Sequence, residues 1–263
     1  MRTLQVAIYG ASTPLGSDTV SRLVQQGHIV GVVEEELVAL QDALNDVLTH
    51  CTGKLLIIDQ EFIPNASISF FMTPSSLEYL IDSNAGTKML VSPAHAEIYV
   101  QDIPEGISEV IIHDMIHPRI DANWSPAPFS AWMAGEEDIL DDRICHWVSW
   151  RDVVEALCIL AGTRIELPRV IDICGRRSIS LNASKKEFMR LLNRSKSALS
   201  STLGVEHLTG ETEDEQFHSG RDERPDLKPL HNSLASAGKE GWHPLMGVEV
   251  SMLEWLAFNF QSE

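Results

Sequence analysis

Three residues that follow one buried strand have side chains that could move a proton or attack a substrate. Ser92, His95 and Tyr99 come directly after the apolar run 88–91. A hydroxyl beside an imidazole is the pairing that nucleophilic catalysis uses. Ser92, His95 and Glu97 could suggest a nucleophile and base, but residues so close together on one strand exit rarely converge into a triad, and the chain has no G-x-S-x-G elbow. Ser92, His95 and Tyr99 are the candidate catalytic residues, but the pattern favours solvated polar loop residues over an assigned catalytic role.

A second polar group follows a later strand. His113, Asp114 and His117 stand at the carboxyl end of the apolar run 108–113, the end of a strand where parallel sheets bind ligands. A His-x-x-x-His spacing suits zinc on a helix, but these two rings belong to a strand end and a proline-rich loop and need not converge. The sequence therefore predicts no metal site, and His113 is a candidate for contact with a substrate.

Residues 4–34 predict the element that would hold a nucleotide. An apolar strand at 6–9 leads into the turn GASTPLG, then a helix starting at Ser17 or Asp18, then a second strand at 29–33. The turn keeps the first and last glycines of a G-x-x-G-x-x-G spacing. Glu34 follows the second strand, where a carboxylate would bind a ribose 2′-hydroxyl. This layout indicates a dinucleotide site that prefers NAD over NADP.

The middle of the turn departs from that spacing. Thr13 replaces the glycine that lets the backbone approach a pyrophosphate, and Pro14 has no N–H to donate. We therefore predict weak binding of NAD; an ordinary β-α-β unit that uses its glycines only for packing is the alternative. The candidate cofactor-binding residues are Gly10, Ser12, Thr13, Leu15, Gly16 and Glu34.

Strands and helices alternate along the rest of the chain. Further strands are expected at residues 54–58, 88–91, 108–113 and 169–174, and helices at 37–48, 75–81, 153–161, 184–192 and 248–258. The polar, charged residues 195–227 predict a mobile loop. The alternation indicates an α/β fold, a Rossmann-type doubly wound parallel sheet with a smaller C-terminal substrate-binding lobe. The expected domains are residues 1–175, with the loop 118–145 contributing to the smaller lobe, and residues 176–263.

The order of several motifs resembles the extended short-chain dehydrogenase/reductases, the NAD-dependent epimerase and dehydratase group, over nearly the whole chain. These motifs are GASTPLG at 10–16, LVS at 90–92, WRDVVEAL at 150–157, IDICG at 171–175, RPD at 224–226 and GWHP at 241–244. The resemblance implies that Ser92 takes the place of the family's catalytic serine or threonine and that Arg224 meets a nucleotide diphosphate. With His113, these are the candidate substrate-binding residues.

The family's acid–base pair, a tyrosine followed four residues later by a lysine, is absent. The residues four positions after Tyr9, Tyr79 and Tyr99 are Thr13, Ser83 and Ile103. The resemblance therefore implies a degenerate, non-catalytic protein that binds a nucleotide or sugar nucleotide, or serves as a partner subunit. One alternative is an NAD-dependent sugar-nucleotide epimerase or reductase with His95 or Tyr99 as an unusual proton donor. Another is a purely structural interaction protein.

Composition limits the partners. A formal charge of −18 over 263 residues disfavours nucleic acid and anionic membranes. The first residues run straight into a strand, and no apolar run is long enough to cross a bilayer, so a cytoplasmic protein without a signal peptide is expected. The four cysteines lack metal-ligand spacing and are expected to be buried thiols.

Association is expected to be weak. The family pairs through helices that include the one carrying the acid–base pair, and that helix is missing here, while the expected helix at 75–81 is short. A weak homodimer or a complex with a related enzyme is the prediction. Trp124, Phe129 and Trp132 are aromatic residues of the kind that anchor interfaces. The alternative is that these aromatic residues pack under the smaller lobe.

Overall fold

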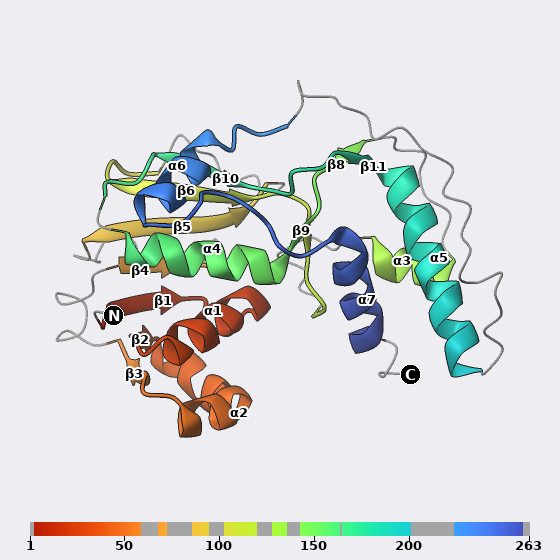
Figure 1. The fold of residues 1–263 in the computed structure, drawn as a ribbon. Coiled ribbons are helices and arrows are strands. Elements are labelled where there is room, and N and C mark those ends of the chain that lie inside the picture. The colour runs from red at the N-terminus through yellow and green to blue at the C-terminus, as the bar shows by residue number, and fades with distance from the viewer. Residues whose placement is uncertain are drawn as a thin grey trace. The chain divides into compact units, whose positions relative to one another are not determined.

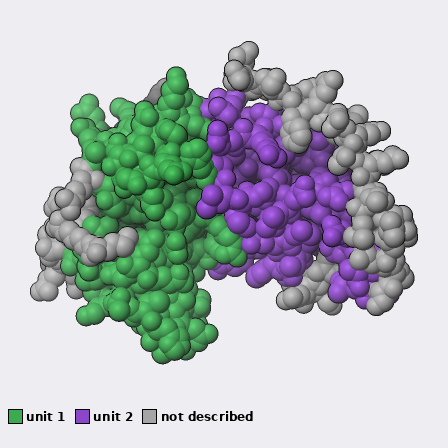
Figure 2. All heavy atoms as spheres, in the orientation of Figure 1, with its two compact units in different colours: residues 1–112, 150–173, 226–243 green, residues 113–149, 174–225, 244–263 purple. Residues whose placement is uncertain are grey.

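The chain divides into two compact units (Figure 2). The computed structural model describes residues 3–58, 68–72, 86–94, 103–119, 128–135, 143–163, 165–200 and 224–259. Unit 1 comprises residues 1–112, 150–173 and 226–243, and unit 2 comprises residues 113–149, 174–225 and 244–263. The sequence-based division differs from this one chiefly at residues 226–243, which return to unit 1 instead of joining the C-terminal lobe.

Unit 1 is built on a parallel sheet (Figure 1). Seven of the described strands form it in the order β10-β6-β5-β4-β1-β2-β3, and all neighbouring strands run parallel. Their bounds are β1 (Gln5–Tyr9), β2 (Ile29–Val32), β3 (Lys54–Ile57), β4 (Ile68–Phe71), β5 (Thr87–Pro93), β6 (Ile107–Ile112) and β10 (Val170–Ile173). The order reverses between β1 and β4, as in doubly wound sheets. The predicted α/β Rossmann-type fold class is confirmed.

The first β-α-β unit follows the apolar pattern of its sequence. Helix α1 (Pro14–Gln25) buries Val20, Leu23 and Val24 along one face. It begins before the expected Ser17 because Thr13 caps its first turn and Pro14 fits the first helical position. Helix α2 (Glu34–His50) also begins earlier than expected, directly after β2.

Two further helices complete the described part of unit 1. Helix α4 (Trp150–Gly162) packs beside α1, and an ion pair of 2.7 Å between Arg22 and Glu155 joins them at the surface. Helix α6 (Lys228–Ser236) packs against α4 and β10. The sequence predicted neither α6 nor β4. The helix expected at 75–81 lies outside the described residues, and no described helix combines the length and apolar character that crossing a membrane requires.

Unit 2 is organised by helices around an aromatic core. The helices are α3 (Phe129–Ala134), α5 (Leu181–Leu199) and α7 (Val248–Asn259), with two short strand pairs, β7 (Met115–Ile116) with β9 (Val148–Ser149) and β8 (Ile144–Cys145) with β11 (Ile179–Ser180). Helix α5 extends through Leu199, so the start of the expected loop 195–227 is helical. Residues 201–223 of that loop lie outside the described residues.

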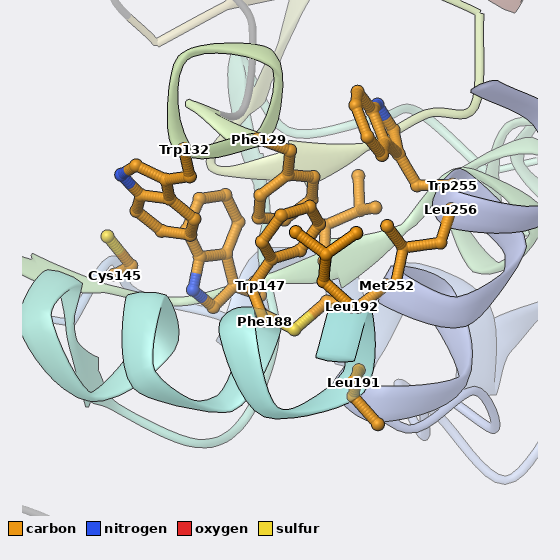
Figure 3. Packing of buried hydrophobic residues seen from close by; sticks show 11 residues of the cluster. Phe129, Trp132, Cys145, Trp147, Phe188, Leu191, Leu192, Met252, Trp255 and Leu256 are labelled. Carbon is orange, nitrogen blue, oxygen red and sulfur yellow. The ribbon is translucent and has the colours of Figure 1, made fainter. Parts of the chain in front are cut away.

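Phe129 lies at the centre of this core (Figure 3). Its ring stacks on Phe188 at 4.8 Å, and its ring centre lies 5.4–5.6 Å from those of Trp132, Trp147 and Trp255. Phe129 and Trp132 are 0% and 1% exposed. Buried side chains cannot anchor a partner, so of the two roles considered for these aromatic residues the structure supports the core role. Trp124 lies outside the described residues.

A buried carboxyl group in the sheet makes stability depend on pH. Glu109 on β6 is 4% exposed, and its Oε2 has no hydrogen-bond partner among the described residues. Loss of solvation, followed by the charge of Asp172, raises its pKa, while Arg169 partly opposes the rise. The folded chain therefore holds this proton more tightly than the unfolded chain. The resulting stabilisation is complete below the unfolded pKa and is lost as pH rises through the folded pKa.

Glu109→Gln is therefore expected to flatten the fall in stability with rising pH. Urea unfolding of both proteins across mildly acidic to neutral pH measures it, and the gain of the variant over wild type should grow with pH. Glu105→Gln, at an exposed position, is the matched control and should track wild type. Parallel pH profiles for Glu109→Gln and wild type would contradict the prediction.

Candidate functional site

The turn between β1 and α1 is held by a left-handed glycine and by the side chain of Thr13. Gly10 has φ +80°, a left-handed conformation that favours glycine. The Thr13 hydroxyl donates a hydrogen bond to the Gly10 carbonyl at 2.8 Å and accepts one from the Gly16 N–H at 3.1 Å. The side chain of Thr13 is thus bound within the turn as the cap of α1.

Gly16 lets helix α1 approach the turn closely. A Cβ at this position would lie 2.3 Å from the Gly10 carbonyl oxygen and 2.9 Å from the Ala11 Cα. Both are backbone atoms, so the side chain cannot be accommodated by a rotamer change. This is the packing role of the last glycine in such turns.

Gly16→Ala is expected to lower the free energy of unfolding by about 1–3 kcal/mol, the usual cost of overpacking. Gly162→Ala is the matched control, because a Cβ at the end of α4 would meet nothing within 4 Å. Urea unfolding followed by circular dichroism measures both variants. Equal free energies of unfolding for Gly16→Ala and Gly162→Ala would show that the turn accommodates a Cβ at residue 16 without loss of stability.

The acidic side chain that reaches the turn is Glu36, in the first turn of α2. Its Oε2 accepts a hydrogen bond from the Ala11 N–H at 3.0 Å. Its Oε1 accepts from the Ser12 N–H at 3.0 Å and from the Ser12 hydroxyl at 2.7 Å. Successive backbone N–H groups in such a turn attract anions. The Glu36 carboxylate therefore takes donors that an anionic ligand would use.

The other predicted cofactor residues are placed around the same turn. Glu34 is exposed at the first position of α2. Leu15 is 1% exposed, so its side chain belongs to the core and only its backbone could meet a ligand. Ser12 is bound to Glu36 as described. Their roles toward a cofactor stay predictions.

The carboxyl ends of β1 and β4 flank the turn at the point where the strand order reverses. The Tyr9 and Phe71 rings stack with their centres 4.9 Å apart and their planes nearly parallel, at 2°. The Met72 N–H donates to the Tyr9 carbonyl at 2.8 Å, which extends the pairing past both strands. Ligands of doubly wound sheets bind at this edge. Tyr9 is 3% exposed, so the described structure gives this tyrosine a packing role.

In unit 2, Asp114 fixes the corner that follows β6. Among the described non-glycine residues it alone has a positive φ, +46°. Its Oδ2 accepts the His146 N–H at 2.7 Å, its carbonyl accepts the Val148 N–H at 3.1 Å, and its Oδ1 lies 3.9 Å from the Arg143 guanidinium. This side chain thus binds other protein groups, and among the described residues no three His, Cys, Asp or Glu side chains are grouped to hold a metal ion.

The loop that follows β10 lies beside His146. The Gly175 N–H donates to the His146 carbonyl at 2.8 Å, which holds the loop carrying Arg176 and Arg177 beside His146. Arg224 Nη1 donates to the Arg176 carbonyl at 3.3 Å. The chain thus brings the backbone of Arg176 to the Arg224 side chain, and Arg143 to Asp114.

The remaining predicted residues are not all brought together. His113 and Arg224 both belong to unit 2. Ser92 lies in unit 1, is 3% exposed and sits near the carboxyl end of β5. His95 and Tyr99 lie outside the described residues.

Comparison with known proteins shows the fold. No protein-family model matches the chain, and no curated protein sequence does. Yeast methylglyoxal/isovaleraldehyde reductase Gre2, complexed with NADPH, matches with TM-score 0.62 and 12% identity over 98% of this chain and 99% of its own. TunA, an NAD-dependent NDP-hexosamine 5,6-dehydratase involved in tunicamycin biosynthesis, matches with TM-score 0.57 and 14% identity over 99% of each chain.

A third structure, WbmG of Bordetella bronchiseptica in complex with NAD and UDP, matches with TM-score 0.56 and 12% identity over 99% of this chain and 96% of its own. These structures have the fold of NAD(P)-dependent short-chain dehydrogenase/reductase-type enzymes, and this chain shares it. At such identities the likeness shows the fold alone.

Sequence reasoning missed Glu36, Asp114 and His146 as structural partners of the candidate sites. Glu36 could have been suspected from three consecutive acids, residues 34–36, after the second strand. Asp114 was considered only as part of a metal cluster. The contact of His146 with the loop at 175–178 has no local signal, because it joins distant segments.

Proposed function

We propose that this protein binds NAD at the β1–α1 turn and a nucleoside diphosphate sugar at the arginine-bearing loop of unit 2. The observation that carries the proposal is the turn itself, with Gly10 at φ +80° and Gly16 in contact with backbone, at the reversal point of a parallel sheet. The fold supports it, since TunA is described as NAD-dependent and WbmG was solved with NAD and UDP.

The backbone conformation of the turn suits a dinucleotide, but few of its N–H groups are available to bind one. Gly10 has the left-handed conformation that the turn needs, and Gly16 lets α1 pack against it. Glu34 follows β2, where a carboxylate would favour NAD over a 2′-phosphate. The amides of Ala11 and Ser12 are engaged by Glu36, and Pro14 has none. Weak binding of NAD is therefore expected.

The diphosphate of the sugar nucleotide would be held by Arg224, supported by Arg176, Arg177 and Arg143. Guanidinium groups bind phosphate oxygens in pairs and keep their charge at all physiological pH values. His113, which belongs to the same unit, is the proposed contact to the sugar.

A second candidate function is an NAD-dependent epimerase, dehydratase or reductase with an unusual proton donor. The fold neighbours are enzymes, and those described above match nearly the whole chain, which favours this candidate over a purely structural role. The missing tyrosine–lysine pair favours binding without ordinary turnover. His95 or Tyr99 would have to supply the proton.

Calorimetry with UDP-, GDP- and dTDP-sugars tests the proposal. Arg224→Gln is expected to weaken binding roughly 10- to 100-fold, since a hydrogen bond to a charged group contributes roughly 1.5–3 kcal/mol. Arg194→Gln, an equal charge change at an exposed position of α5, is the matched control. Absence of binding by every sugar nucleotide, or equal affinity of Arg224→Gln and wild type, would refute the proposed role of this loop.

A further inference from the structure

The Glu36 carboxylate sits directly on the donors of the β1–α1 turn. Both of its oxygens are used, one by Ala11 and one by Ser12, at 2.7–3.0 Å. At hydrogen-bond distance no ligand atom fits between the carboxylate and these amides. A ribose or phosphate oxygen that needs the same amides must displace the side chain.

The position of Glu36 in α2 supports this arrangement. It lies in the first turn of the helix, where the helix dipole favours negative charge. Its N–H donates to the Val33 carbonyl at 3.1 Å, so its backbone is fixed while the side chain spans to the turn. The contact joins segments 24 and 25 residues apart and ties α2 to the start of α1.

We propose that Glu36 is an internal occupant of the turn, which competes with the adenosine phosphate portion of a dinucleotide for the amides of Ala11 and Ser12. Binding then requires the side chain to swing away, and the apparent affinity is the intrinsic affinity multiplied by the fraction of molecules in which it has done so. The proposal rests on the proposed function only in taking a dinucleotide as the ligand of this turn.

A different role for Glu36 predicts the opposite result. If this carboxylate instead holds the ribose hydroxyls of a bound dinucleotide, its removal must weaken binding. If it serves only to join two segments, its removal must leave affinity unchanged. The direction of the change therefore separates the three roles.

Calorimetric titration of NAD and of ADP into Glu36→Gln and wild type is the test. We expect the variant to bind both ligands at least about tenfold more tightly, a change of about 1.4 kcal/mol. Glu35→Gln is the matched control, because it removes the same charge from the same helix turn at an exposed position. It should bind as wild type does.

Ser12→Ala provides a second variant that leaves the Glu36 side chain in place. It removes one of the three hydrogen bonds to the carboxylate and should also tighten NAD binding, by less than Glu36→Gln. Circular dichroism confirms that each variant is folded. Unchanged or weaker binding of NAD and ADP in Glu36→Gln, or no binding by any of these proteins, overturns the proposal.

The titration of sugar nucleotides into Arg224→Gln tests the proposed function separately, since it uses another ligand and another unit. Failure of the Glu36 proposal can therefore be distinguished from failure of the proposed function. Amide chemical shifts of Ala11 and Ser12 give an independent readout. Both should move in Glu36→Gln without ligand, and in wild type they should move when NAD binds. Shifts that are equal in wild type and Glu36→Gln would show that the carboxylate does not engage these amides.

Discussion

Phe129→Ala is expected to lower the stability of unit 2 by about 3–5 kcal/mol, the usual cost of deleting a buried phenyl ring. The ring is fully buried and contacts the rings of Trp132, Trp147, Phe188 and Trp255. Its removal leaves a cavity at the point where α3, α5 and α7 meet (Figure 3). Aromatic pairs contribute beyond their buried area, so the loss should lie toward the upper end.

Urea unfolding followed by tryptophan fluorescence measures the change, since three of the neighbouring rings are tryptophans. Phe258→Ala, on α7 but half exposed, is the matched control and should cost under about 1 kcal/mol. A similar small loss in Phe129→Ala would mean that the aromatic rings do not form the core of unit 2.

Hydride transfer between NADH and a sugar nucleotide is expected to be roughly 10²–10⁴-fold slower than in an enzyme with a positioned acid–base pair. The tyrosine–lysine pair is absent from the sequence, and only residues 94–106 separate β5 from β6, where the short-chain dehydrogenase/reductases that the sequence resembles have a long helix. Single-turnover absorbance of NADH with each sugar nucleotide measures the rate.

His95→Ala and Tyr99→Phe identify the proton donor of any residual reaction. Loss of the residual rate in one variant assigns the proton transfer to that residue. A wild-type rate usual for enzymes of this fold would contradict the prediction and establish the second candidate function.

The sequence predicted unit 1 better than unit 2. Periodic apolar residues and glycine boundaries located β1, α1, β2 and α4 to within a few residues. β4 was missed because its four residues are buried on both faces and show no alternation. The two-residue strands of unit 2 exist only through pairing with distant segments, which no local pattern reveals.

The candidate site shows the same limit. Gly10 and Gly16 were identified from spacing because backbone geometry restricts which residues fit. Glu36 was missed because its contact depends on how α2 leaves β2, and the sequence suggested a later start for that helix. The sequence shows that an acidic residue is present, but which groups its side chain contacts depends on where the helix that carries it begins.

Unit 2 is formed by three separate segments of the chain, residues 113–149, 174–225 and 244–263, and this affects its folding during synthesis. Phe129 and Trp132 leave the ribosome long before α7, which carries Met252, Trp255 and Leu256 of the same core. Domains generally fold as units, N-terminal first, and exposed apolar surface promotes aggregation. The aromatic residues of α3 therefore remain incompletely packed until α7 has been synthesised. We expect nascent chains arrested before α7 to depend on chaperones.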